Sequence, residues 1–144
     1  MVKKYTFWLK ASIVFQLLTA GLHSFSFVND LQPTDDRERQ LLDLMNSYKL
    51  DFGMGFTPTM QNLMTSFSIG FTLLLVLGGT VNWFLLAKKA DLAIVRGVIG
   101  INVIVFGALF IAMLFLTFMI PIVCQALIFI ALMLAYLTAP KRTQ

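Results

Sequence analysis

The chain has 144 residues, of which 58% are hydrophobic and only 12% are charged, whereas soluble globular domains carry about 25% charged residues. This composition excludes an ordinary soluble domain and indicates one small integral membrane domain. The formal net charge of +4 does not indicate nucleic-acid binding, because the basic residues stand at the ends of apolar runs, where they set membrane topology.

The first apolar run, 7–28, is predicted to be a transmembrane helix, since about 20 helical residues cross the core of a bilayer. Trp8 and Lys10 suit the membrane interface near its start. Polar residues follow one face of this helix at spacings of 4, 3, 4 and 3, and they are Ser12, Gln16, Thr19, His23 and Ser26. Such a stripe must be hidden from hydrocarbon, so this helix needs partners. The length of the run and its internal polar residues argue against a cleaved signal peptide.

The one sizeable polar segment, 29–58, contains six acids and three bases. The sequence Pro33-Thr34-Asp35-Asp36 is typical of a helix start, and apolar residues then recur at helical spacing. We therefore expect an amphipathic helix over 35–48, which lies on the membrane or over the mouth of a helix bundle. Because it lacks a face rich in lysine and arginine, the sequence favours the second role, a cap on the bundle. Two glycines and a proline break the helix in 52–58, and the aromatic and Met side chains there predict a loop that enters the membrane interface.

Three further apolar runs predict transmembrane helices at 59–87, 92–118 and 121–138. Gly78 and Gly79 in the first of these favour close packing or a bend. Small residues in the second form a predicted packing seam, and they are Ala93, Gly97, Gly100 and Gly107. Pro121 is expected at the first position of the last helix, after a very tight turn.

The basic residues predict the orientation of the chain. In a four-pass topology one side of the membrane receives Lys3, Lys4, Lys10, Lys88, Lys89, Arg96, Lys141 and Arg142. The segment 29–58, with three bases against six acids and hence a net charge of −3, falls on the other side. The positive-inside rule therefore predicts that both termini are cytoplasmic, and we expect a protein of the bacterial inner membrane.

Depth along the predicted helices brings several polar residues to one level beneath the acidic segment. These residues are His23, Ser26, Asn62, Ser66, Cys124 and Gln125, and they predict an outward-facing polar pocket in which histidine serves as an acid, a base or a pH-sensitive group. Gln16 and Asn102 both lie near mid-membrane and are predicted to pair by a hydrogen bond. The alternative, which the pattern favours, is that all these side chains join helices through interhelical hydrogen bonds.

Several signals of chemistry are missing from the sequence. The single histidine has no second histidine or HExxH motif beside it, and the single cysteine, Cys124, has no clear activating partner. No Asp or Glu lies within an apolar run, so the intramembrane carboxylate expected of a proton-coupled multidrug pump is missing. No nucleotide-binding fingerprint is present. We therefore expect no cofactor, no metal and no catalytic residue.

The sequence thus predicts an all-α, antiparallel four-helix membrane bundle with an extracytoplasmic amphipathic helix between the first two spans. This layout resembles that of small bacterial four-pass membrane proteins and is broadly similar to DoxX-like families. We expect a non-catalytic component that contacts the lipid bilayer and packs with itself or within a larger membrane complex, such as an accessory subunit. The alternatives are a binding protein or enzyme for a lipid, quinone or other apolar ligand in the pocket near His23, and a channel or transporter.

Overall fold

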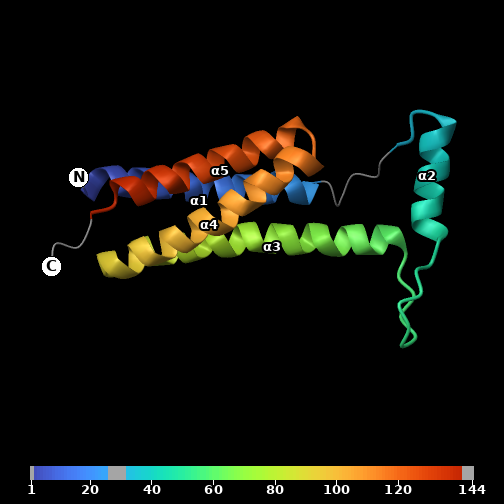
Figure 1. Cartoon of the computed structure of the whole chain (residues 1–144), viewed down its shortest axis with the longest axis horizontal. Coiled ribbons are helices and arrows are strands. Elements are labelled where there is room, and N and C mark those ends of the chain that lie inside the picture. Colours follow the sequence, from blue (N-terminus) through green and yellow to red (C-terminus); the bar gives the residue numbers. More distant parts are fainter. Residues whose placement is uncertain (1, 26–31, 141–144) are drawn as a thin grey trace. The chain divides into compact units, whose positions relative to one another are not determined.

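The computed structural model describes residues 2–25 and 32–140, and this part of the chain is all-α, as predicted. It forms α1 (Val2–Ser24), α2 (Asp36–Ser47), α3 (Met60–Ala87), α4 (Leu92–Leu116) and α5 (Met119–Thr138) (Figure 1). The one β-bridge among these residues is isolated and joins Lys49 to Thr59.

Three of the described helices, α3, α4 and α5, are long and apolar enough to cross a membrane. This confirms the prediction of an integral membrane protein whose apolar helices fit a lipid bilayer. Helix α1 is not among these three, and its sequence contains the polar residues Lys10, Gln16 and His23. It also begins at Val2, five residues before the predicted span, and the end of that predicted span, 26–28, lies outside the described residues.

The chain divides into two compact units, which we describe separately. The first unit combines Met1–Ala20 with Leu75–Gln144, and the second is Gly21–Leu74. The first unit therefore contains most of α1, the second half of α3, and all of α4 and α5. Large side chains that are fully buried form its core, and they include Leu9, Leu75, Ile99, Phe106, Ile128 and Leu132.

Short connections within the first unit are fixed by local hydrogen bonds. After α3, the N–H of Ala90 donates to the carbonyl of Leu85, and the N–H of Lys89 donates to that of Leu86. With Lys89 at a φ of 49°, this is a Schellman ending. Asp91 then caps α4 by accepting a hydrogen bond from the N–H of Ala93.

The turn between α4 and α5 lies earlier than the sequence predicts. Helix α4 ends at Leu116, and α5 begins at Met119, which places Pro121 at the third helical position and not at the first. The difference is physically permitted, because N–H groups in the first turn of a helix have no intrahelical partner and a proline there forfeits no bond.

The second unit contains α2, the loop that follows it and the first half of α3. Asp35 caps α2 by accepting a hydrogen bond from the N–H of Glu38, so the helix occupies the predicted 35–48 region with one flanking residue at each end. In the loop, the N–H of Leu50 donates to the carbonyl of Pro58. Its tip passes through Met54 at a φ of 58°, between two glycines that also have positive φ.

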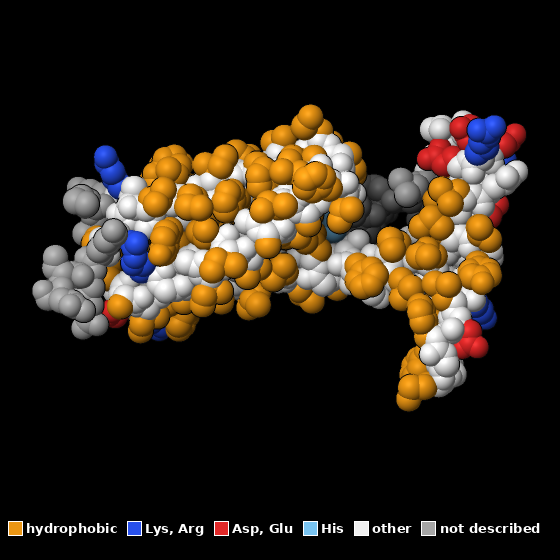
Figure 2. All heavy atoms as spheres, in the orientation of Figure 1, with side chains coloured by type: hydrophobic (Ala, Val, Ile, Leu, Met, Phe, Trp, Pro, Cys, Tyr) orange, Lys and Arg blue, Asp and Glu red, His pale blue; other side chains and the backbone are white. Residues whose placement is uncertain are grey.

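The surface of the long helices differs in composition from that of α2. Figure 2 shows hydrophobic side chains over most of the visible surface of the long helices, whereas acidic and basic side chains gather on α2. None of the residues of α2 is buried, and its apolar side chains Leu41 and Leu44 are more than half exposed.

Candidate functional site

A cluster of three amides from three helices lies in the first unit. Gln16 of α1 and Asn82 of α3 are both fully buried. The Nδ2 of Asn82 donates to the Oε1 of Gln16 at 3.5 Å, a long hydrogen bond. The Nδ2 of Asn102 of α4 donates to the Oδ1 of Asn82 at 3.2 Å. Asn82 therefore connects the two residues that the sequence predicted to bond directly to each other.

The sequence pattern did not single out Asn82 as a member of this cluster. Asn82 of α3 lies beside Gln16 of α1, because the two side chains share a hydrogen bond. The alternation of polar residues along 7–28 correctly indicated that Gln16 faces protein, since its side chain is fully buried.

A glycine in α3 makes room for this cluster. A Cβ atom at Gly78 would lie 2.6 Å from the Nε2 of Gln16 and 3.0 Å from the ring of Phe106. The neighbouring Gly79 is close to α1 as well, since a Cβ there would lie 3.2 Å from the side chain of Leu17. The two glycines thus serve close packing of α3 against α1 and α4, one of the two roles that the sequence suggested.

A second buried amide, Gln125, joins α5 to α4. Its Nε2 donates to the backbone carbonyl of Phe106 at 3.1 Å, and its side chain is 1% exposed. The other amide atom, Oε1, has no hydrogen-bond partner among the described residues, and the same holds for the Nε2 of Gln16. Each of these buried glutamines therefore uses part of its hydrogen-bonding capacity to hold two helices together.

Arg96 joins α4 and α5 near the start of α4 and the end of α5. Its Nη1 donates to the backbone carbonyl of Tyr136 at 3.1 Å and to that of Ala139 at 2.7 Å. The guanidinium also lies over the ring of Tyr136, with its carbon 4.4 Å from the ring centroid. A cation at the C-terminal carbonyls of α5 complements the negative end of the helix dipole.

The small residues of α4 differ in their surroundings. A Cβ at Gly107 would lie 2.8 Å from the ring of Phe129, and one at Gly100 would lie 3.3 Å from that of Tyr136. These two glycines therefore admit aromatic rings of α5. Ala93 and Gly97 are exposed, and a Cβ at Gly97 would meet nothing within 4 Å.

The residues of the predicted outer pocket have separate local surroundings. In the second unit, the ring of His23 meets that of Phe71 edge to face, with centroids 5.0 Å apart. Asn62 and Ser66 are exposed and bonded within their own region of α3. The Oδ1 of Asn62 accepts from the hydroxyl of Thr59, and the hydroxyl of Ser66 donates to the carbonyl of Asn62.

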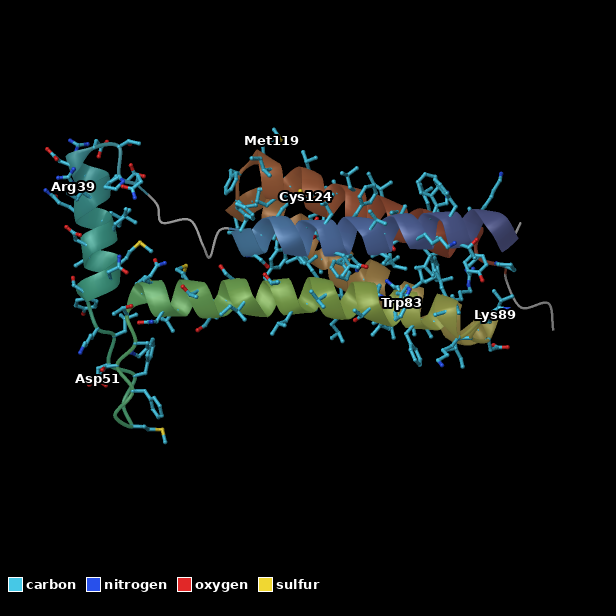
Figure 3. All side chains as sticks on the ribbon, turned by 180° about the vertical axis from the view of Figure 1, so that it is seen from behind. Arg39, Asp51, Trp83, Lys89, Met119 and Cys124 are labelled. Carbon is cyan, nitrogen blue, oxygen red and sulfur yellow. The ribbon has the colours of Figure 1, made fainter. Side chains whose placement is uncertain are left out.

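Cys124 and Gln125 belong to the first unit, where Cys124 is a half-buried free thiol on α5 (Figure 3). Ser26 lies outside the described residues. The gathering of all six residues in one pocket stays a prediction.

The described residues contain no group of three or more His, Cys, Asp or Glu side chains placed to hold a metal ion. Among the described residues, the buried amides of Gln16, Asn82 and Gln125 form hydrogen bonds between helices. A comparison with protein families, curated proteins and solved structures found no match.

Proposed function

We propose that this protein is a non-catalytic membrane component that assembles through the exposed face of α4, with a second copy of itself or within a larger membrane complex. The observation that carries the proposal is the exposure of Ala93 and Gly97 on a helix long and apolar enough to span the membrane. Lipid offers little hydrophobic drive for association, so spanning helices associate where small residues let backbones approach closely.

This face continues along the whole helix. Exposed residues recur at spacings of 4, 4, 3, 4, 3 and 4, and they are Ala93, Gly97, Ile101, Ile104, Ala108, Ile111 and Phe115. Alternating spacings of 3 and 4 keep one side of a helix turned toward a partner. The inward-facing Gly100 and Gly107 are already occupied by rings of α5, so the outward row is available for another chain.

We further propose that α1 is the fourth span of an antiparallel four-helix bundle. Its polar stripe supports this, because Ser12 and Gln16 are fully buried while Val14 and Leu18 are more than half exposed, as lipid contact requires. The hydrogen bond between Gln16 and Asn82 ties α1 to a helix that is apolar enough to cross the membrane. The positive-inside rule then favours cytoplasmic termini in a bacterial inner membrane.

The same proposal places α2 and its loop at the outer membrane interface. None of the apolar residues of α2 is buried. This favours contact of α2 with lipid headgroups and argues against a role as a cap on the bundle. The loop tip supports the same assignment, since Phe52, Met54 and Phe56 are between 67% and 96% exposed. The loop leads directly into α3, so its tip cannot lie far from the membrane surface.

The assembly proposal is tested by filling the outward row of α4. Gly97→Ile adds bulk where nothing stands within 4 Å, so it leaves the fold intact and blocks close approach of another helix. Gly70→Ile is the matched control, because Gly70 is an exposed glycine of α3 that also has nothing within 4 Å. We expect Gly97→Ile alone to reduce the assembled fraction, measured by stepwise photobleaching in native-membrane nanodiscs.

Two results would contradict the proposal. One is an unaltered chain that shows single bleaching steps and also purifies from mild detergent without any other protein. The other is an equal loss of assembly in Gly97→Ile and Gly70→Ile, since that would show a general effect of bulk in the membrane.

A further inference from the structure

A groove lies between α1 and the second half of α3, within the first unit. Its volume is about 470 Å³, and it is lined by Lys10, Ile13, Val14, Trp83, Leu86 and Ala87. Sites for small molecules span about 300–1,000 Å³, so the groove is large enough for a ligand. Five of its six lining residues are apolar, and the sixth is a lysine.

The groove lies near the end of α3, at the level where a membrane-spanning helix leaves the hydrocarbon. Trp83, Leu86 and Ala87 occupy the last two turns of a helix that is apolar enough to span the membrane, and Lys88 and Lys89 follow directly. Figure 3 shows Trp83 on this part of α3, with Lys89 beyond the end of the helix. Tryptophan and lysine are both typical of the level at which a span leaves the hydrocarbon. Trp83 is 61% exposed, so the wall that it forms is open to the surroundings of the helix.

We propose that this groove binds an anionic phospholipid, with one acyl chain along the apolar wall and the phosphate beside the ammonium group of Lys10. An acyl chain is already in apolar surroundings within a bilayer, so the apolar wall accepts any lipid and selects none. Selection comes from Lys10, an exposed cation beside the groove. None of the described residues that line the groove is acidic, so none of them competes with a phosphate for this ammonium group.

The expected selectivity is modest. A lysine near a membrane surface contributes about 1 kcal/mol to the attraction of anionic lipid, which corresponds to about a fivefold preference over a zwitterionic lipid. The proposal concerns a lipid beside α1 and α3, and it is independent of whether the chain assembles through α4.

Tryptophan fluorescence measures the occupant of the groove directly. The chain has two tryptophans, so Trp8→Phe leaves Trp83, a groove residue, as the single reporter. This protein is placed in vesicles of phosphatidylcholine that contain increasing fractions of either dibrominated phosphatidylglycerol or dibrominated phosphatidylcholine. Bromine quenches tryptophan on contact, and we expect the anionic lipid to quench Trp83 at about one fifth of the fraction that the zwitterionic lipid requires.

Three further variants assign the preference to Lys10. Lys10→Gln is expected to bring the two quenching curves together, whereas Lys10→Arg keeps the charge and the preference. Lys4→Gln is the matched control, because Lys4 is an exposed lysine of the same helix that does not line the groove. It is expected to retain the preference.

The proposal is overturned by equal quenching by the two lipids in the Trp8→Phe protein. It is overturned equally by a preference that survives Lys10→Gln, or by one that Lys4→Gln removes as completely as Lys10→Gln does. The last result would mean that the lipid preference comes from the total positive charge near the start of α1 and not from Lys10 in the groove.

Discussion

The buried amide cluster and the polar segment around α2 solve the same problem, the pairing of polar side chains, in opposite ways. In the cluster, Asn82 bonds to residues that are 66 and 20 positions away in the chain. Around α2 and the start of α3, side chains bond to groups two to four positions away, as in the pairs Thr34–Glu38 and Thr59–Asn62. The first arrangement holds helices together, and the second shapes one helix end or loop.

The difference follows from the surroundings of each region. A polar side chain that faces water already has partners, so a local bond there fixes backbone geometry and contributes little to the packing of helices. A polar side chain within an apolar helix lacks water and must find its partner in the protein, and Asn82 and Asn102 find partners on another helix. Mutations in the cluster should therefore disturb the packing of several helices, whereas mutations around α2 should act within a few residues.

The largest effect is expected from crowding the cluster. In Gly78→Ala, the new Cβ meets the amide of Gln16 and the ring of Phe106, which are both buried, so these side chains must shift within the core. Overpacking of this kind costs about 1–3 kcal/mol of unfolding free energy. Reversible unfolding in mixed micelles of SDS and a mild detergent measures the change.

Gly70→Ala is the control on the same helix. A Cβ at Gly70 meets nothing within 4 Å, so its unfolding free energy should stay close to that of the unaltered protein. Equal losses in both variants would mean that the cost comes from the helix backbone and not from the cluster.

A smaller effect is expected from removing the central amide. Asn82→Leu deletes two interhelical hydrogen bonds, each of which contributes about 0.6 kcal/mol on average in membrane proteins. It also leaves the amide of Gln16 buried without its partner, so we expect a total loss of about 1–2 kcal/mol in the same unfolding experiment.

Asn62→Leu tests the contrast on the same helix. Among the described residues, the side chain of Asn62 accepts hydrogen bonds from the N–H and the hydroxyl of Thr59, near the start of α3. This variant should accelerate hydrogen exchange at the first turn of α3 and leave the global unfolding free energy nearly unchanged. A global loss as large as that of Asn82→Leu would remove the distinction between the two regions.

The sequence predicts local features well because their causes are local. The start of α2 follows from Pro33-Thr34-Asp35-Asp36, and the loop tip follows from two glycines around Met54. The apolar runs likewise indicated α3, α4 and α5, since length and hydropathy suffice to predict a spanning helix.

The cluster was only partly predictable, because its partners depend on how far each helix is displaced along its neighbour. Periodicity showed that Gln16 faces protein and that Asn102 is a polar residue within an apolar helix. It carried no information about which amide lies between them, and it did not single out Asn82. The different surroundings of the glycines of α4 were hidden for the same reason, since Gly97 and Gly100 belong to one small-residue pattern although only Gly100 meets a ring of α5.

The smallest effect, and the most local one, is expected from the titration of Glu38 at the start of α2. Hydrogen bonds from the backbone N–H and the hydroxyl of Thr34 hold the pKa of the Glu38 carboxyl below its ordinary value. Because the folded pKa lies below the unfolded one, the bonded carboxylate stabilises the helix start above the ordinary pKa. That contribution is lost as the pH falls through the lowered value.

The carboxyl carbon resonance of Glu38 reports this titration directly. Its midpoint should lie below that of a free glutamate, and Thr34→Val should raise it, because valine retains the N–H donor and removes the hydroxyl. The amides of the first turn of α2 should lose protection over the same pH interval, while those around Asn82 stay protected. A Glu38 midpoint that Thr34→Val leaves in place would show that the hydroxyl does not help to hold the carboxylate. Simultaneous loss of protection around Asn82 would show that the two regions are coupled and that bonds around α2 reach beyond their own helix.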